Sequence, residues 1–156
     1  MRKLLGLAAC LLVGALVVSA LFWHRYVREA PPERHPDALM HFKYGSYGSE
    51  KTGMPYPIWK VLPQICPELL PGGWAQLGFY TEPGHDLPVG VSLRKLGVPR
   101  VGLNCAACHS GTLDGGPAAG GAYIAGMPSP RFDSQGYNRF ILRCTTSERF
   151  TPDVVM

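Results

Sequence analysis

The sequence predicts a mainly α-helical chain with extensive irregular loops, placed behind an N-terminal transmembrane helix. An uncharged apolar run, residues 4–23, follows Arg2 and Lys3 near the start of the chain. Glycine (19) and proline (15) make up about a fifth of the 156 residues, which excludes a bundle of long helices. Three Trp, seven Tyr and six Phe argue against plain disorder, so a loop-rich domain with a small core remains.

The charge balance excludes a nucleic-acid-binding surface. Lys and Arg number 15, and Asp and Glu number 11, which gives a formal net charge of +4. Two of the positive charges, Arg2 and Lys3, precede the apolar run. The remaining charges are nearly balanced and form no basic cluster, so we expect no nucleic-acid partner.

Residues 1–23 are predicted to be a signal anchor or a signal peptide. At about 1.5 Å per residue, residues 4–23 are long enough to cross the roughly 30 Å hydrocarbon core of a bilayer. In an uncleaved anchor, Trp23 and Tyr26 would lie at the outer interface, where aromatic residues are favoured. The membrane is then a partner of the chain through this helix.

Cleavage is the second interpretation of this segment, because Val18, Ser19 and Ala20 resemble the small-residue pattern at which signal peptides are cut. A lipoprotein signal ending at Cys10 is the third. Only six apolar residues precede that cysteine, which is short for a signal core. All three interpretations export the rest of the chain, so we expect it on the periplasmic side of the bacterial inner membrane.

Residues 24–36 are charged and proline-rich, a composition that suits a tether holding a domain off the membrane surface. The domain itself is predicted over residues 37–156. Frequent Gly and Pro residues allow only short elements in its first half. Pro57 favours a helical turn there, because proline is well tolerated in the first turn. Residues 87–93 are expected to form a short extended piece before a turn at residues 97–99.

The second half of the domain contains a glycine-rich loop, residues 114–126, and then a helix capped by Asp133 or Ser134. The apolar face of that helix is expected to carry Tyr137, Phe140, Ile141 and Cys144. A further helix would begin near Pro152, but the sequence stops at Met156. A single isolated turn is not stable, so either this end frays or the chain is a piece of something longer.

Residues 104–109 read Asn-Cys-Ala-Ala-Cys-His and contain a Cys-x-x-Cys-His motif. Cys105 and Cys108 lie on one side of a helical turn, so both sulfurs can bond to the two vinyl groups of one haem. His109 then points its imidazole at the iron from the same side. Covalent attachment of this kind takes place outside the bacterial cytoplasm, which agrees with export. The sequence therefore predicts one covalently attached haem c.

Two other chemistries use similar cysteines. A thioredoxin-like pair sits within a βαβ pattern, and the short run of residues 100–103 offers no such pattern. A zinc site needs four ligands, and Cys66, Cys144 and His85 lack the paired spacing that such sites show. Cys66 and Cys144 fit a disulfide and buried apolar residues equally well.

The sequence does not identify the sixth iron ligand. Met127 is the natural candidate, 18 residues beyond His109, and a thioether there would raise the reduction potential. Packing of Met127 beside the haem is the plainer interpretation. His85 and His41 are weaker candidates, because a lone histidine in a polar loop is usually solvated. An open sixth position would let a small ligand such as oxygen or peroxide bind.

Short sequence words of two to six residues on both sides of the motif match a known pattern. They are His-Phe-Lys-Tyr-Gly-Ser (41–46), Pro-Tyr (55–56) with Trp59, Leu-Pro (62–63), Leu-Pro-Val-Gly (87–90), Pro-Arg-Val-Gly (99–102) and Arg-Phe-Asp (131–133). With the motif, these words resemble the amino-terminal portion of the rubber-oxygenase-like bacterial c-type cytochromes, a family distantly similar to the dihaem cytochrome c peroxidases. The resemblance covers roughly residues 41–156 and implies a cytochrome c-like haem domain.

The chain departs from this family in one respect, because members carry a second Cys-x-x-Cys-His motif and this sequence has one. The resemblance therefore implies a first haem domain and no two-haem mechanism. Haem binding carries over to Cys105, Cys108 and His109, which match the motif residue by residue. It does not carry over to Met127.

The flanking words also have a structural interpretation. Their aromatic residues would form an apolar wall around a haem: Phe42, Tyr44, Trp59, Trp74, Phe79 and Tyr80. Arg100 is a further cofactor-binding candidate, because a guanidinium matches the carboxylate of a haem propionate, and an exposed Arg fits the sequence as well. Lys43 is expected to be a surface charge.

We expect an electron carrier with His109 as axial iron ligand, a haem fixed by Cys105 and Cys108, and an unidentified redox partner protein. Two alternatives stay open. One is the haem domain of a haem-dependent oxygenase or peroxidase whose other half is absent. The other is an exported thiol–disulfide protein without haem.

Overall fold

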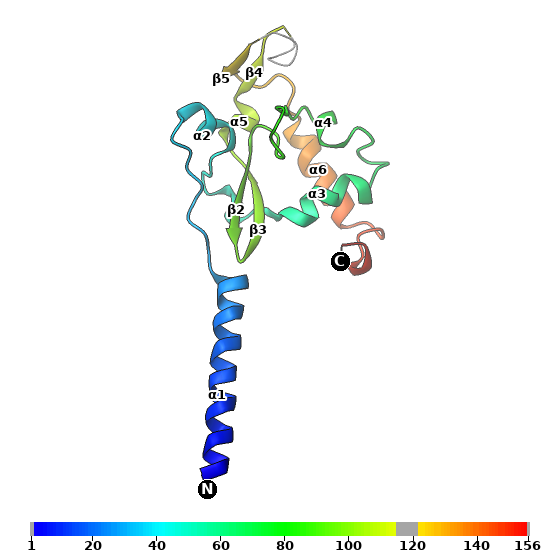
Figure 1. The fold of residues 1–156 in the computed structure, drawn as a ribbon. Coiled ribbons are helices and arrows are strands. Elements are labelled where there is room, and N and C mark those ends of the chain that lie inside the picture. Colours follow the sequence, from blue (N-terminus) through cyan, green and yellow to red (C-terminus); the bar gives the residue numbers. More distant parts are fainter. Residues whose placement is uncertain (1, 115–121, 156) are drawn as a thin grey trace.

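The computed structural model describes residues 2–114 and 122–155. A long N-terminal helix projects from one end of a folded domain (Figure 1). About 46% of the residues are helical, which confirms the helical, loop-rich character of the chain. The helices are α1 (Arg2–Phe22), η1 (Trp23–Val27), α2 (Ala38–Tyr44), η2 (Ser49–Lys51), α3 (Tyr56–Ile65), α4 (Gly73–Gln76), α5 (Cys105–Cys108), α6 (Ser134–Thr145) and α7 (Pro152–Val155). The strands are β1 (Met54–Pro55), β2 (Val91–Leu96), β3 (Val98–Leu103), β4 (Ser110–Thr112) and β5 (Tyr123–Ala125).

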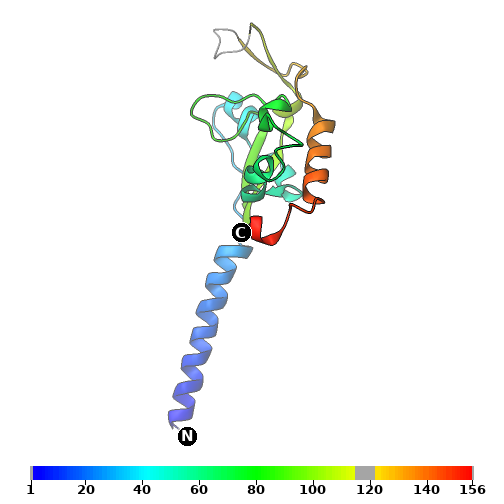
Figure 2. The ribbon, with the colours of Figure 1, turned by 90° about the vertical axis from the view of Figure 1, so that its right-hand side faces the viewer.

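Helix α1 continues into η1 and stands clear of the domain in two perpendicular views (Figures 1 and 2), whereas η1 contacts the β2–β3 turn at Gly97. The window Gly6–Val27 is apolar, 22 residues long and entirely unburied. Its length and composition suit a membrane span and a signal sequence alike. An N-terminal apolar helix of the predicted kind is therefore present, and its cleavage after Ala20 stays a prediction.

The segment expected to be a tether differs from a free spacer, because its first residues pair with the domain. The Ala30 amide donates to the Lys95 carbonyl oxygen over 2.8 Å, and Glu29 forms an antiparallel bridge with Leu96. Further along, the Ser46 amide donates to the Glu33 carbonyl oxygen over 3.1 Å. Residues 29, 30 and 33 are therefore held against the domain, and the role of residues 24–36 as a tether stays a prediction.

Two predicted helices are confirmed. Helix α3 has its proline in the first turn, as expected from Pro57, and ends at Ile65. Helix α6 is capped by Asp133, whose carboxylate accepts a hydrogen bond from the Gly136 amide over 2.7 Å. Helix α7 begins at Pro152, where the sequence indicated a helix start.

The buried faces of α3 and α6 meet in the main core. A disulfide between Cys66 and Cys144 joins them across a sequence separation of 78 and decides between the two states left open for these cysteines. In the loop-entropy account, a bridge of this span stabilises the fold by about 4–5 kcal/mol. Beside it, the indole rings of Trp59 and Trp74 stack 4.4 Å apart, and Phe140 meets Trp74 edge-on at 5.4 Å.

Two small sheets complete the domain. The extended piece expected over residues 87–93 is confirmed in part, because residues 91–93 begin β2, and the turn expected at residues 97–99 is present at Gly97, whereas the pairing of the strands into sheets was not predicted. The first is antiparallel with the order β1-β3-β2, and its β2–β3 register runs from Val91 opposite Leu103 to Leu96 opposite Val98. The single residue Gly97, with φ +73°, makes the hairpin turn. The second sheet pairs β4 with β5. Most of the predicted glycine-rich loop, residues 115–121, lies outside the described residues, as do Met1 and Met156.

Candidate functional site

The Cys-x-x-Cys-His turn is held in place by the residue before it, Asn104, which caps α5. The Asn104 Oδ1 atom accepts a hydrogen bond from the Ala106 amide over 2.9 Å. Its Nδ2 atom donates to the carbonyl oxygens of Lys43 and Gly45, each over 3.2 Å. Asn104 is buried, so all these hydrogen bonds are shielded from water. The turn is therefore fixed to helix α2.

A second contact fixes the turn from behind. Gly90 has a φ of +91°, and a Cβ at this position would collide with the backbone of Ala107. The Gly90 carbonyl oxygen accepts from the Asn104 amide over 2.9 Å. Because Ala106 and Ala107 face inward and are buried, the cysteines at the two ends of α5 face outward.

The three residues predicted to hold a haem are brought together on this one exposed turn. Cys105 and Cys108 are free thiols, and both are exposed, as is His109. Within residues 2–114 and 122–155, no side chain forms a hydrogen bond with the His109 ring. Two reachable thiols and an adjacent free imidazole are the donor set that covalent haem attachment requires, so the residues present fit that group.

A resident metal ion held by side chains alone has no such support in the described part of the chain. There, no group of three or more His, Cys, Asp or Glu residues could hold a metal ion. Of the candidates for a zinc site, Cys66 and Cys144 are bonded to each other. The ring of His85 stacks on the ring of Tyr44 at 4.3 Å.

Met127 lies beside the motif in the fold. The Gly126 amide donates to the His109 carbonyl oxygen over 2.9 Å, and the Ser129 amide donates to the Cys108 carbonyl oxygen over 2.8 Å. These two hydrogen bonds bracket Met127, whose half-buried side chain packs against Gly111. Its role as a sixth ligand stays a prediction.

The other sequence candidates lie elsewhere. Arg100 is on β3, where its guanidinium donates to the Gly53 carbonyl oxygen over 3.4 Å, so the structure does not bring it to the motif. The His41 ring accepts a hydrogen bond from the His35 amide over 3.4 Å and lies 5.1 Å from the Tyr47 ring.

A buried charged cluster beside the motif was missed by sequence reasoning. Lys43 is only 7% exposed, which corrects its expected place on the surface. Its Nζ atom lies 2.6 Å from Glu82 Oε1 and 4.3 Å from the centre of the Tyr123 ring. The Tyr44 hydroxyl donates to the other Glu82 oxygen over 2.8 Å. No sequence signal joins Lys43 to Glu82, because 39 residues separate them.

This cluster keeps Glu82 ionised. Burial alone would raise the pKa of Glu82, but hydrogen bonds from Lys43 and Tyr44 and the nearby His85 lower it more strongly, so the net pKa is lowered. The pKa of Tyr44 is raised, first by burial and then by its hydrogen bond to the Glu82 carboxylate. Burial also raises the pKa values of Tyr80 and Tyr123. At ordinary pH the charges of Lys43 and Glu82 therefore cancel, and the tyrosines around them stay protonated.

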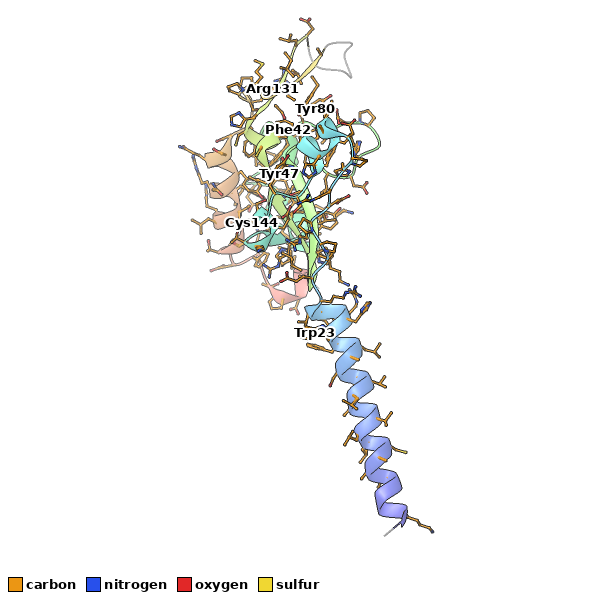
Figure 3. The ribbon with its side chains drawn as sticks, turned by 90° about the vertical axis from the view of Figure 1, so that its left-hand side faces the viewer. Trp23, Phe42, Tyr47, Tyr80, Arg131 and Cys144 are labelled. Atoms are coloured by element: carbon orange, nitrogen blue, oxygen red, sulfur yellow. A yellow bond between two sulfur atoms is a disulfide. The ribbon has the colours of Figure 1, made fainter. Side chains whose placement is uncertain are left out.

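The aromatic wall predicted from the sequence is divided between two places. Trp59, Trp74 and Phe79 belong to the main core, away from the motif. Tyr44, Phe42 and Tyr80 pack instead in a smaller cluster with Ala106 of the motif turn. Figure 3 shows Phe42 and Tyr80 at the end of the domain far from Trp23.

A small polar cavity of about 120 Å³ opens next to this second cluster. Its lining includes Tyr80, Ser110, Thr112, Ser129 and Arg131. The Tyr80 hydroxyl is buried and has no hydrogen-bond partner in the described residues. A larger cavity of about 540 Å³ lies between β3 and α6, and Cys105, Cys108 and His109 are not among its lining residues.

Comparisons with known proteins add no relative. The chain matches no protein-family model, no curated protein and no solved structure.

Proposed function

We propose that this chain is a membrane-anchored, exported c-type cytochrome domain that carries one covalently bound haem and transfers electrons. The observation that carries the proposal is the motif turn. Two exposed free thiols and an imidazole without a hydrogen-bond partner in the described residues share one turn that Asn104 and Gly90 fix from behind. Haem, when bound, would supply an iron that cycles between the ferric and ferrous states.

The other cysteines support the assignment of this turn. In an oxidising compartment, exposed thiols tend to become disulfides. Cys66 and Cys144 are paired in the interior and bridge α3 to α6. The domain therefore has its structural disulfide already, and Cys105 and Cys108 are left for chemistry.

The surrounding residues would tune such a site. His109 would supply an imidazole ligand to the iron, and the Cys105 and Cys108 sulfurs would hold the porphyrin. Apolar rings of the second cluster exclude water from one side of the turn. The neutral Lys43–Glu82 pair places balanced charges next to it, so neither oxidation state is strongly favoured by a nearby net charge.

Thiol–disulfide exchange without haem is the second candidate, favoured by the same two exposed free thiols. A haem-dependent enzyme is the third, if the sixth position on the iron is open. The three candidate functions predict purified proteins that differ in colour and in carbon monoxide binding. One expression experiment therefore distinguishes them.

The test is an absorption spectrum of the full chain, expressed with c-type haem maturation and purified in detergent. Oxidised and dithionite-reduced spectra are recorded, then repeated with carbon monoxide and after denaturation. We expect a haem that stays attached in denaturant in the unaltered chain and in the Cys10→Ala control. The double variant Cys105→Ala/Cys108→Ala should have none.

A colourless unaltered chain would overturn the cytochrome assignment and favour the dithiol. A low-spin haem that carbon monoxide does not change would support the electron carrier. A high-spin haem that takes up carbon monoxide would favour an enzyme instead.

A further inference from the structure

The junction between the N-terminal helix and the domain fixes which end of the domain faces the membrane. Helix η1 ends at Val27, and the bridge between Glu29 and Leu96 follows after a single residue, Arg28. We propose that this junction holds the motif turn at the membrane-distal end, where its redox partner is a water-soluble electron-transfer protein. The proposed partner rests on the proposed function, whereas the orientation rests on α1 as a membrane anchor.

Two polar contacts lock the junction to the sheet. The Ala30 amide donates to the Lys95 carbonyl oxygen, and the Arg94 Nε atom donates back to the Ala30 carbonyl oxygen, each over 2.8 Å. The Arg94 guanidinium also lies 3.8 Å from the Glu29 carboxylate. Residues 29 and 30 therefore pair with the edge of β2 as a short additional strand would. This pairing leaves no hinge between the helix and the sheet.

The hairpin turn touches the helix itself. A Cβ at Gly97 would collide with the carbonyl oxygen of Tyr26, so the turn lies directly against η1. Trp23 and Tyr26 are exposed aromatic residues at the end of the apolar span, and such residues favour the membrane interface. Gly97 and the exposed Val98 therefore lie at the level of the lipid headgroups.

Strand β3 leads from this level to the motif. It begins at Val98 and ends at Leu103, immediately before Asn104 and α5. Six strand residues at about 3.3 Å each span about 20 Å. Figures 1 and 2 show the β2–β3 hairpin continuing roughly along the direction of α1, with β4 and β5 at the far end of the domain. Molecules confined to the bilayer therefore cannot contact the turn.

The segment after the junction also forms hydrogen bonds with the domain. The Ser46 amide binds the Glu33 carbonyl oxygen at 3.1 Å, and the His35 amide binds the His41 ring at 3.4 Å. These contacts run up the side of the domain and join it to helix α2. The chain that leaves η1 is thus held to the domain at several points.

The surface around the motif suits a protein partner. Among the described residues that follow the motif, 110–114 and 122–130, one is charged, Asp114, and the exposed Arg131 comes directly after them. Leu113 and Ala125 are exposed on the β4–β5 side of the membrane-distal end. A weakly charged surface with exposed apolar groups resembles the centre of a protein–protein interface more than a surface for a charged lipid.

The orientation of the domain relative to the membrane is tested with the full chain in lipid bilayers. The measurement does not depend on electron transfer. Val98→Cys and Leu113→Cys are each labelled with the same fluorophore in a Cys10→Ala background. Quenching is measured with a phospholipid that carries a nitroxide on its headgroup. We expect at least five-fold stronger quenching at residue 98 than at residue 113. Equal quenching at the two positions would overturn the orientation.

A flexible insertion provides the matched control. Six Gly and Ser residues between Val27 and Arg28 should bring the two quenching values close together, because the domain is released from η1. The same insertion between Pro83 and Gly84, an exposed loop, should leave the difference unchanged. If no haem attaches, the measurement is repeated with Cys105→Ser and Cys108→Ser, so failure of the proposed function is separate from failure of the orientation.

The partner class is tested on the haem-loaded chain in the same bilayers. A small soluble c-type cytochrome, reduced beforehand, is expected to reduce the haem at least ten-fold faster than a lipid-dissolved quinol does. The insertion at residues 27–28 should raise the quinol rate, because the released domain can reach the bilayer. Equal rates for the two donors with the unaltered chain would overturn the assignment of a water-soluble partner. A mature chain that begins at Leu21 would overturn the anchor.

Discussion

The side-chain amide of Asn104 donates to the carbonyl oxygen of Lys43 over 3.2 Å and so joins the turn that carries Cys105 and Cys108 to helix α2. The two residues are 61 positions apart in the chain. Lys43 binds Glu82 through its side chain and Asn104 through its backbone. The charged cluster and the motif turn are therefore one connected unit.

Replacement of Asn104 by Ala should destabilise the domain by about 1–2 kcal/mol, because it removes the helix cap and leaves the Lys43 carbonyl oxygen with fewer donors. Urea unfolding followed by circular dichroism measures the loss. Asn104→Asp keeps the capping oxygen but loses both donors, so its loss shows the contribution of the contacts to α2. Asn138→Ala, on the exposed face of α6, is the control. Equal stability of Asn104→Ala and the control would contradict the role of the cap.

Replacement of Lys43 by Met should destabilise the domain by about 1–3 kcal/mol, because it leaves the partly buried Glu82 carboxylate without its cation. The double variant Lys43→Met/Glu82→Gln should recover much of that loss, since no unpaired charge remains. A thermodynamic cycle of the three variants gives the coupling energy. Additive losses, with no coupling, would show that the two side chains do not interact in solution.

Stability should fall in acid through Glu82. Its pKa is lowered in the folded state, so its contribution is complete above the usual carboxyl pKa of about 4.5 and is lost as pH falls through the lowered value. Unfolding midpoints at pH 7 and at pH values below 4.5 should therefore differ more in the unaltered chain than in Glu82→Gln. The same acid sensitivity in both proteins would assign the effect to other carboxylates.

Loss of the disulfide should cost about 4–5 kcal/mol in the loop-entropy account. The double variant Cys66→Ser/Cys144→Ser is expected to unfold at lower urea concentration, with haem attachment unchanged in the chains that fold. Addition of a reductant to the unaltered protein should shift its midpoint in the same direction. A midpoint that neither change affects would show that the bridge is not formed.

Local signals were sufficient to predict α3, α6 and the motif turn. Pro57 and Asp133 mark helix starts through the chemistry of a first turn and a cap, which needs no distant partner. The exposure of Cys105, Cys108 and His109 also follows from a short helix with alanines on its inner face.

The sheets and the charged cluster were not predictable in this way. The first half of β2, residues 91–93, was expected to be extended, but Arg94 and Lys95 interrupt the apolar alternation in its second half, and nothing local indicates which strands it pairs with. Lys43 is buried only because Glu82 and Tyr123 arrive from distant parts of the chain. The docking of residues 28–30 likewise depends on an open edge of β2, which the composition of a charged, proline-rich segment does not reveal.

The bridge between Cys66 and Cys144 encloses the motif turn, because residues 105–109 lie between the two cysteines in the chain. A single cut of the backbone anywhere between them leaves both fragments covalently joined. Proteolytic nicking in this stretch would therefore release no fragment that carries the motif turn until a reductant is added. The nicked and intact forms would run together on a non-reducing gel and separate only on a reducing one.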